Sequence, residues 1–282
     1  MKLAVSNIAW SDDEEAAVFA LLRQRGVTAI EVAPTRLWPC WTGATTAAAR
    51  AARARLADEG FEVPSFQAIL FGKPDLNLFR DPVAFGDHLR RVADLAAEFG
   101  AHALVLGAPR NRDRGSLSAA AAFAKATDFF RAMGAECAAR DTVLCLEPNP
   151  PAYGCNFITT SAEGLALVRA VASPGFALHL DAAGMVLADD DPAAAILMSR
   201  SALRHFHISE PHLAPIVPAT IDHARIGRTL RRSGYDGWVA IEMRRTDDSI
   251  AALARAVDQA RACYRDRLRI RAPTAAAIEA VA

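Results

Sequence analysis

The sequence predicts an α/β protein built as a single (β/α)8 TIM barrel. Short apolar runs typical of buried parallel strands alternate with longer helical patterns along the whole chain. Eight such strand–helix units in about 250 residues match the count and length of an eight-stranded barrel. The chain has 282 residues, of which 52% are hydrophobic, so it can bury one large core.

The expected strands share short runs of apolar residues. They span residues 2–8, 29–32, 65–71, 103–107, 142–146, 177–180, 204–208 and 238–241. The expected helices between them span residues 12–24, 45–58, 81–99, 117–139, 162–171, 192–199, 223–232 and 249–265. Several helices follow a capping residue, and several stop at a glycine, which are the usual helix boundaries. The candidate caps are Ser11, Asp81, Ser116, Ser161 and Asp191, and the glycine stops are Gly26, Gly60, Gly100 and Gly234.

A doubly wound open sheet is the alternative arrangement of these elements. It calls for a glycine-rich phosphate loop after the first strand, but the chain reads S-N-I-A-W-S-D-D there. No shift in composition and no linker marks a second domain. We therefore expect one barrel over residues 1–270 and a C-terminal tail over residues 271–282, which forms a short helix or a frayed end.

Charge and composition limit the classes of partner. The 32 basic and 32 acidic residues cancel, whereas a dedicated nucleic-acid-binding protein usually has a basic surface. No apolar run reaches the roughly 18 residues that cross a bilayer, and the N-terminus lacks a signal-peptide core. The five cysteines are odd in number and form no C-x-x-C pair, which is typical of reduced thiols. We expect a cytoplasmic protein that binds neither nucleic acid nor membrane, with a homo-oligomer left open.

The chemistry of such a barrel lies at the C-terminal ends of its strands. The last four expected strands end in L-C-L-E-P-N-P, L-H-L-D-A-A-G, R-H-F-H-I-S-E and V-A-I-E-M-R-R. Each of them delivers one metal-type side chain at the same height: Glu147, Asp181, His207 and Glu242. Because side chains alternate along a strand, all four are expected to face the barrel mouth. A second inward layer beneath them would hold Cys145, His179, His205 and Ala240.

Three carboxylates and an imidazole that converge need a counter-charge. A buried acid without a partner costs on the order of several kcal/mol, and a divalent cation removes that cost. The oxygen-rich set suits Mn²⁺, Mg²⁺ or Co²⁺ and also admits Zn²⁺, whereas a structural zinc would prefer thiolates. We predict one divalent metal ion per chain, with Mn²⁺ as the first choice, held by Glu147, Asp181, His207 and Glu242.

With these four residues in this order, the chain resembles the sugar phosphate isomerase/epimerase family, whose fold is the xylose isomerase-like barrel. The resemblance runs from about residue 1 to residue 263 and is strongest from residue 144 onward. In that family Glu, Asp, His and Glu from strands five to eight hold the metal, here in L-E-P-N-P, H-L-D, F-H-I-S-E-P and A-I-E-M. The segment G-Y-D-G-W-V-A-I-E-M and the ligand intervals of 34, 26 and 35 residues are similar to the ketose 3-epimerase branch.

The resemblance departs from the ketose 3-epimerases at three substrate-binding positions. Where those enzymes carry a histidine, a glutamate and an arginine, this chain has Gly184, Tyr153 and Leu213. A free ketohexose is therefore not expected as the substrate, although the metal ligands are intact.

The ligand set allows a defined chemistry. A divalent ion chelated by neighbouring hydroxyl and carbonyl oxygens acidifies the carbon-bound proton between them. As in the related epimerases, Glu147 and Glu242 are expected to be both metal ligands and catalytic proton carriers. The prediction is a divalent-metal-dependent isomerase or epimerase that acts on a sugar or sugar-derived hydroxy-carbonyl compound through a metal-bound enediolate. A metal-dependent dehydratase or lyase on a related polyol or keto-sugar derivative is the main alternative.

Further residues near the strand ends are candidates for contact with a small-molecule carbohydrate or derivative. The predicted substrate-binding residues are Trp10, Gln67, Asn149, Tyr153, His212 and Arg244. Lys73, Trp38 and Trp41 are further replacements for the lost contacts, and the mixture suits a phosphorylated, acidic or ring-bearing sugar derivative. The run R-N-R-D-R at residues 110–114 either meets a phosphate or carboxylate or is a solvated loop.

Two interpretations from other classes stay open. An apurinic-site endonuclease uses the same barrel with three zinc ions, but this chain lacks the further histidines needed after strands two to four and after Asp181. A barrel without catalysis that serves as a binding subunit is the other, although the intact ligand ring argues against it. Metal content and proton exchange in deuterated water separate these interpretations from an isomerase.

Overall fold

Eight parallel strands form the centre of the computed structural model, which describes residues 1–264. Neighbouring strands pair in the order β2-β1-β8-β7-β6-β5-β4-β3, and bridges such as Val32–Phe66 join β2 to β3 and close the ring. The predicted (β/α)8 barrel is confirmed. The strands are β1 (Lys2–Ser6), β2 (Ile30–Glu31), β3 (Ser65–Phe66), β4 (Ala103–Leu106), β5 (Val143–Leu146), β6 (Phe176–Asp181), β7 (Leu203–Ile208) and β8 (Trp238–Ile241).

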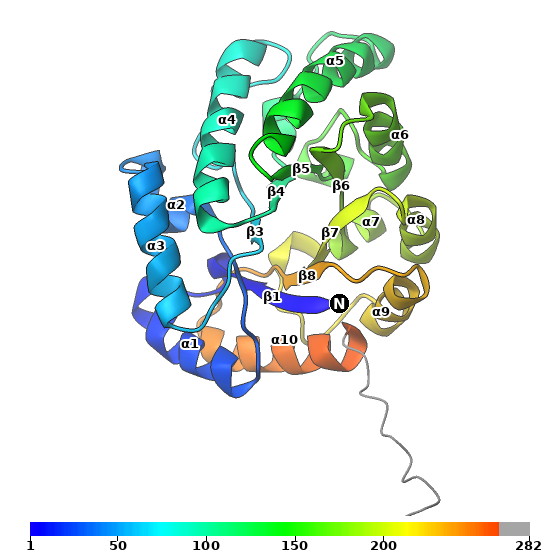
Figure 1. Ribbon diagram of the computed structural model, residues 1–282. Coiled ribbons are helices and arrows are strands. Elements are labelled where there is room, and N and C mark those ends of the chain that lie inside the picture. Colours follow the sequence, from blue (N-terminus) through cyan, green and yellow to red (C-terminus); the bar gives the residue numbers. More distant parts are fainter. Residues whose placement is uncertain (265–282) are drawn as a thin grey trace, which may run out of the picture.

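Helices surround the strands as an outer layer (Figure 1). Within the described residues they are α1 (Glu15–Gln24), α2 (Pro34–Leu37), α3 (Thr46–Asp58), α4 (Pro82–Phe99), α5 (Ala119–Ala138), α6 (Ser161–Val171), α7 (Ala182–Leu187), α8 (Pro192–Ser199), α9 (His223–Arg232) and α10 (Ser249–Tyr264). No helix of residues 1–264 is long and apolar enough to span a membrane.

Helix α4 illustrates why the expected helices form where they do. The Asp81 side chain accepts a hydrogen bond from the Ala84 N–H at 3.0 Å, and Pro82 occupies the first turn, where its missing N–H costs nothing. The helix ends at Gly100, whose φ of 74° is the left-handed conformation that favours glycine. One face is buried, including Leu89 and Val92, so the helix packs on the barrel while its other face meets solvent.

Strands β1 and β3 are shorter than predicted, and the short helices α2 and α7 were not predicted. Strand β3 ends at Phe66 rather than at residue 71, because Ala68 turns to a φ of 52° and the chain leaves the sheet as a loop. Helix α7 was not expected, and it begins directly after β6 because the Asp181 carboxylate caps it. The predicted boundary at residue 270 and the tail 271–282 lie outside the described residues, so that division of the chain stays a prediction.

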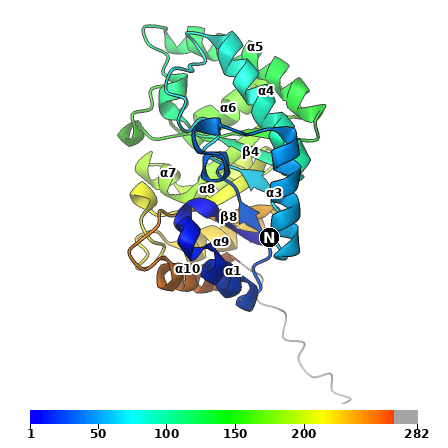
Figure 2. The same ribbon diagram turned by 90° about the vertical axis from the view of Figure 1, so that its left-hand side faces the viewer.

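The loops that follow the strands gather at one end of the barrel. Figure 2 shows the barrel from the side, with α7 and these loops away from the N-terminus of β1. Parallel strands present their carboxyl ends together, so this end collects the side chains that follow β5 to β8. It is therefore the place where the candidate ligands meet.

Candidate metal centre and active site

Strand register places three of the predicted ligands side by side. Asp181 pairs with His207 across β6 and β7, and His207 pairs with Ala240 on β8, two positions before Glu242. The ligand atoms of Asp181, His207 and Glu242 all lie within 4.8 Å of one another. His207 Nδ1 is 3.2 Å from Glu242 Oε2, so this nitrogen faces the cluster.

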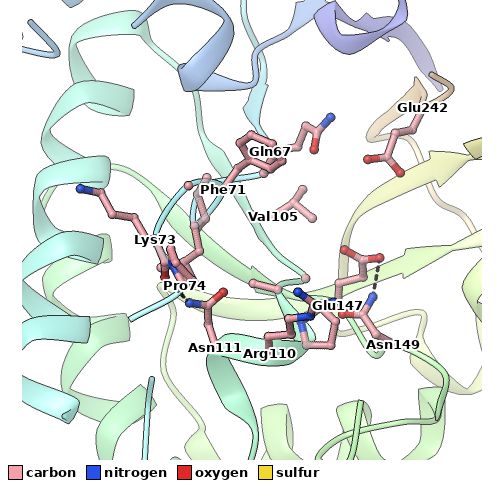
Figure 3. A pocket seen from close by; sticks show the side chains of 17 residues that line it. Gln67, Phe71, Lys73, Pro74, Val105, Arg110, Asn111, Glu147, Asn149 and Glu242 are labelled. Atoms are coloured by element: carbon pink, nitrogen blue, oxygen red, sulfur yellow. Dashed lines mark hydrogen bonds between the residues drawn. The ribbon is translucent and has the colours of Figure 1, made fainter. Parts of the chain in front are cut away.

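Glu147, the fourth predicted ligand, lies on the same mouth but outside that tight group of three. Figure 3 shows its carboxylate turned towards that of Glu242 across the cavity. Asn149 Nδ2 donates to Glu147 Oε1 at 2.9 Å and holds the side chain in place. A Cβ atom at Gly107 would lie 2.5 Å from Glu147 Oε2, so any other residue at this position would push the carboxylate out of its observed place.

The Asp181 carboxylate is fixed by two donors from its own neighbourhood. The Gly184 N–H donates to Oδ1 at 2.6 Å, and Ser209 Oγ donates to Oδ2. Ser209 is itself held by the Ala183 N–H, which donates to its hydroxyl at 3.1 Å. The start of α7 and the end of β7 therefore orient this ligand together.

A buried carboxylate from β2, Glu31, lies beneath the ligands and was missed by the sequence analysis. Ser65 Oγ donates to Glu31 Oε2 at 2.7 Å, and His205 Nε2 lies 2.6 Å from the same oxygen. The other oxygen, Oε1, lies 3.0 Å from His207 Nε2. His207 thus presents one ring nitrogen to Glu31 and the other to Asp181 and Glu242, the usual arrangement around a metal-binding histidine.

The charges of this lower network support one another. Burial alone would raise the pKa of Glu31, but the His207 charge and the His205 hydrogen bond hold that pKa well below its ordinary value. Burial alone would lower the pKa of His207, but Glu31 and Glu242 raise it well above the ordinary histidine value. Burial lowers the pKa of His179, whose ring packs edge-on against His207 with centroids 4.2 Å apart.

The upper carboxylates repel one another. Burial, followed by the negative charges of Asp181 and Glu242, raises the pKa of Glu147 to about 8. Burial and the charge of Glu242 raise the pKa of Asp181 to about 6. His207 Nδ1, which is buried, has no hydrogen-bond partner among residues 1–264. A divalent cation fits this set, because it would neutralise the crowded oxygens and use the free ring nitrogen.

Two cavities open onto these residues. One of about 570 Å³ lies between the loops after β3 and β4, and one of about 440 Å³ lies over the ends of β5, β6 and β7. Glu147, Asn149 and Glu242 line both cavities. The two glutamates therefore stand where the cavities meet.

The predicted substrate-binding residues fall into two groups. Gln67 and Asn149 line the larger cavity, and Asn149, Tyr153 and His212 line the smaller one. Tyr153 accepts a hydrogen bond from the His212 N–H at 3.0 Å, so these two form one wall.

Trp10 and Arg244 are among the lining residues of neither cavity. Trp10 is only 2% exposed and packs edge-on against Phe19 in the core, and Arg244 is exposed. Trp38 and Trp41 are also buried in the core. Contact between these side chains and a substrate stays a prediction without support from their positions.

Arg112 is a second residue of the site whose place the sequence did not reveal. Its guanidinium is buried and donates to the carbonyl oxygens of Gly107 and Glu147 and to Asn149 Oδ1. Arg112 is therefore not solvent-exposed, and its guanidinium is occupied by these acceptors and is not available to bind a phosphate. It ties the ends of β4 and β5 together and orients the amide that holds Glu147.

Comparison with known proteins shows the family of the chain. The sequence model of the xylose isomerase-like TIM barrel family matches residues 19–267. A ketose 3-epimerase from Arthrobacter globiformis is 32% identical over 90 residues, which are 32% of this chain and 31% of that protein. The chain thus aligns with about a third of the length of this relative.

Solved structures of other epimerases share the fold. D-psicose 3-epimerase from Clostridium cellulolyticum H10, solved with D-tagatose, superposes with a TM-score of 0.78 at 18% identity, covering 93% of this chain and 99% of its own. The 3-keto-D-glucoside 4-epimerase from E. coli gives 0.75 at 20% identity, covering 93% and 100%. The family match, together with the ordered cluster at the barrel mouth, leads to one conclusion: this chain belongs to the xylose isomerase-like TIM barrel family.

Proposed function

We propose that this protein is a divalent-metal-dependent epimerase or isomerase of a sugar-derived hydroxy-carbonyl compound. The observation that carries the proposal is the pair Glu147 and Glu242, which face each other where two cavities meet, beside Asp181 and His207. Similar proteins that are epimerases support the same reaction class. The two cavities together offer more space than a bare sugar fills, which supports a sugar derivative as the substrate.

Each residue has a defined task in this proposal. Glu147, Asp181, His207 and Glu242 would hold the cation, which when bound polarises neighbouring hydroxyl and carbonyl oxygens of a substrate. Glu147 and Glu242 approach from β5 and β8, so one can remove a carbon-bound proton while the other returns it on the opposite face. Asn149 and Gly107 keep the Glu147 carboxylate in position for that transfer.

Metal content tests the first part of the proposal. We expect about one divalent ion per chain in protein purified without chelator, measured by elemental analysis. Asp181→Asn and His207→Ala should each lose the ion and keep the fold by circular dichroism, while Glu62→Gln, an exposed control, keeps both. A metal-free wild type, or three zinc ions per chain, would contradict the proposal.

Proton exchange tests the second part. Metal-loaded protein in deuterated water should introduce deuterium next to the carbonyl of keto-sugar and keto-glycoside substrates, followed by NMR. Glu147→Gln and Glu242→Gln should each slow exchange by a factor on the order of 100 or more, with Glu62→Gln as control. Metal occupancy is measured in every sample, and near-normal exchange in either variant would remove that residue from the mechanism.

Elimination of a hydroxyl group is the second candidate reaction. The same two glutamates, on either side of the place where the cavities meet, suit this reaction as well: Glu242 would remove a carbon-bound proton, and Glu147 would deliver a proton to the departing hydroxyl, which leaves as water. Loss of water gives an unsaturated product, which ultraviolet absorbance and mass spectrometry distinguish from an epimer of unchanged mass.

A further inference from the structure

The loop after β3 presents an aromatic ring on a fixed backbone. Trp41 Nε1 donates to the Phe71 carbonyl at 2.9 Å, and His88 Nε2 lies 2.8 Å from the Ile69 carbonyl oxygen. Asn111 Nδ2 donates to the Lys73 carbonyl at 2.7 Å, which holds the end of the loop against the loop after β4. The loop backbone is therefore anchored from three sides.

The Phe71 ring is nevertheless 69% exposed. A large apolar side chain on a well-anchored loop loses free energy by facing water, because its burial elsewhere would be favourable. Phe71 also lines the cavity of about 570 Å³ that reaches Glu147 and Glu242. The exposed ring thus stands on a wall of the space that leads to the proposed reaction centre.

The chemistry of this cavity changes along its length. Its carboxylates, Glu147 and Glu242, lie at the end that it shares with the second cavity, and its wall elsewhere includes Leu70, Phe71 and Pro74. Figure 3 shows the Lys73 ammonium pointing away from the two glutamates. An apolar surface therefore continues outward from a polar, metal-type site.

The available room exceeds what one monosaccharide needs. Each cavity alone falls within the range of about 300–1,000 Å³ that accommodates drug-sized ligands, and the two share Glu147 and Glu242 in their walls. A sugar ring over the metal ligands would leave the space beside Phe71 free for a second group.

We propose that the cavity between the loops after β3 and β4 binds an apolar ring attached to the reacting sugar, such as the aglycone of an aryl glycoside. The inference rests on the proposed function, which puts the sugar at Glu147 and Glu242. Phe71 would stack on the substituent, and its anchored backbone would lower the entropic cost of binding.

Equilibrium binding to Mg²⁺-loaded protein tests this inference without requiring turnover. The probes are phenyl and methyl β-D-glucopyranoside, phenyl and methyl β-D-galactopyranoside, and glucose 1-phosphate, measured by isothermal titration calorimetry. We expect a phenyl glycoside to bind about tenfold or more tightly than its methyl partner, as burial of part of an aromatic face allows. Phe71→Ala should abolish the preference, while Val83→Ala, which removes an equally exposed apolar side chain outside the cavity, should retain it.

Each other outcome overturns the inference. If the phenyl and methyl glycosides bind equally, or if none of the four glycosides binds, the cavity gives no advantage to an apolar ring. A phenyl preference that survives in Phe71→Ala places the ring elsewhere. Tighter binding of glucose 1-phosphate that is lost in Arg110→Ala identifies an anion site instead. Proton exchange by the wild type is measured separately, so the proposed function can fail or stand independently of this result.

Discussion

A single buried carboxylate, Glu31, sets the electrostatics beneath the candidate metal ligands. It touches His205 and His207 at 2.6 and 3.0 Å and is wholly buried. The negative charge keeps a proton on the facing side of the His207 ring, which leaves Nδ1 for the cluster of Asp181 and Glu242. The choice of ligand atom therefore depends on a residue that cannot itself reach the cation site.

Glu31→Gln should weaken divalent-metal binding by about 10- to 100-fold, the usual effect of removing such a supporting partner. The amide is nearly isosteric, so circular dichroism should remain that of a folded barrel. Titration calorimetry with Mn²⁺ provides the measurement, with the exposed Glu62→Gln as the control. An unchanged dissociation constant in Glu31→Gln would show that His207 is oriented without Glu31.

Glu147 should make the stability of the metal-free protein depend on pH. Its pKa is raised in the folded state, so its contribution is favourable at low pH and is lost as the pH rises through about 8. Relative to the wild type, Glu147→Gln should gain about 1–2 kcal/mol of unfolding free energy between pH 5 and pH 9, a value reduced for partial solvent access. Urea unfolding in chelator at both pH values measures this difference, and an equal difference at the two pH values would contradict it.

At the scale of elements, the ends of β4 and β5 are joined by a side chain rather than by backbone pairing alone. The buried Arg112 guanidinium bonds to carbonyl oxygens at the ends of both strands and to Phe157 in the following loop. Asn149 receives a further bond and passes the constraint to Glu147. The loop after β5 thus has the rigidity that a positioned proton carrier requires.

Replacement of Arg112 should therefore be costly. Arg112→Ala leaves the buried carbonyl oxygens of Gly107 and Glu147 without their side-chain donor, at about 1–3 kcal/mol for each group, so we expect a loss of about 3 kcal/mol in unfolding free energy. Arg110→Ala, at an exposed neighbouring position, should change it by less than about 0.5 kcal/mol. Denaturant unfolding compares the two variants, and similar values for both would contradict the structural role of Arg112.

At the scale of the whole molecule, the barrel brings two cavities to one set of carboxylates. The smaller cavity is lined by Tyr153, Leu213 and Asp181, and Gly184 lies at the start of α7 beside the Asp181 carboxylate. At the three altered positions, Gly184, Tyr153 and Leu213, the chain lacks the charged or polar groups that the ketose 3-epimerases, which it resembles, carry there. Under the proposed function, we therefore expect other surfaces, including the loops after β3 and β4, to select the substrate.

Free ketohexoses should consequently be poor substrates. Three lost polar contacts, each worth roughly 1–3 kcal/mol when buried, weaken binding by several orders of magnitude unless replaced. We expect kcat/KM for fructose, tagatose and psicose to stay below about 10⁴ M⁻¹s⁻¹, measured by chromatography of the epimer mixture with metal-loaded protein. Efficient epimerisation of any of the three would overturn this prediction.

The sequence by itself determined the eight strand–helix units, since strand and helix periodicity are local properties of the chain. It also indicated which side chains end the last four strands, because all parallel strands of a barrel present their carboxyl ends on one side. The buried group of Asp181, His207 and Glu242 agrees with a divalent-metal site on that side. The fold and the neighbourhood of these residues therefore followed from pattern and topology.

Only the tertiary structure decided how distant residues meet. Glu31 lies 174 positions from His205 and contacts it because the closed barrel turns both side chains inward, an arrangement that no local spacing records. Likewise, Arg112 is buried rather than solvated because backbone carbonyl oxygens from three segments converge on it. The exposed Phe71 ring follows from a turn at Ala68 and from anchors on other loops. Such contacts depend on packing between segments far apart in sequence, which is why the local pattern left them undetermined.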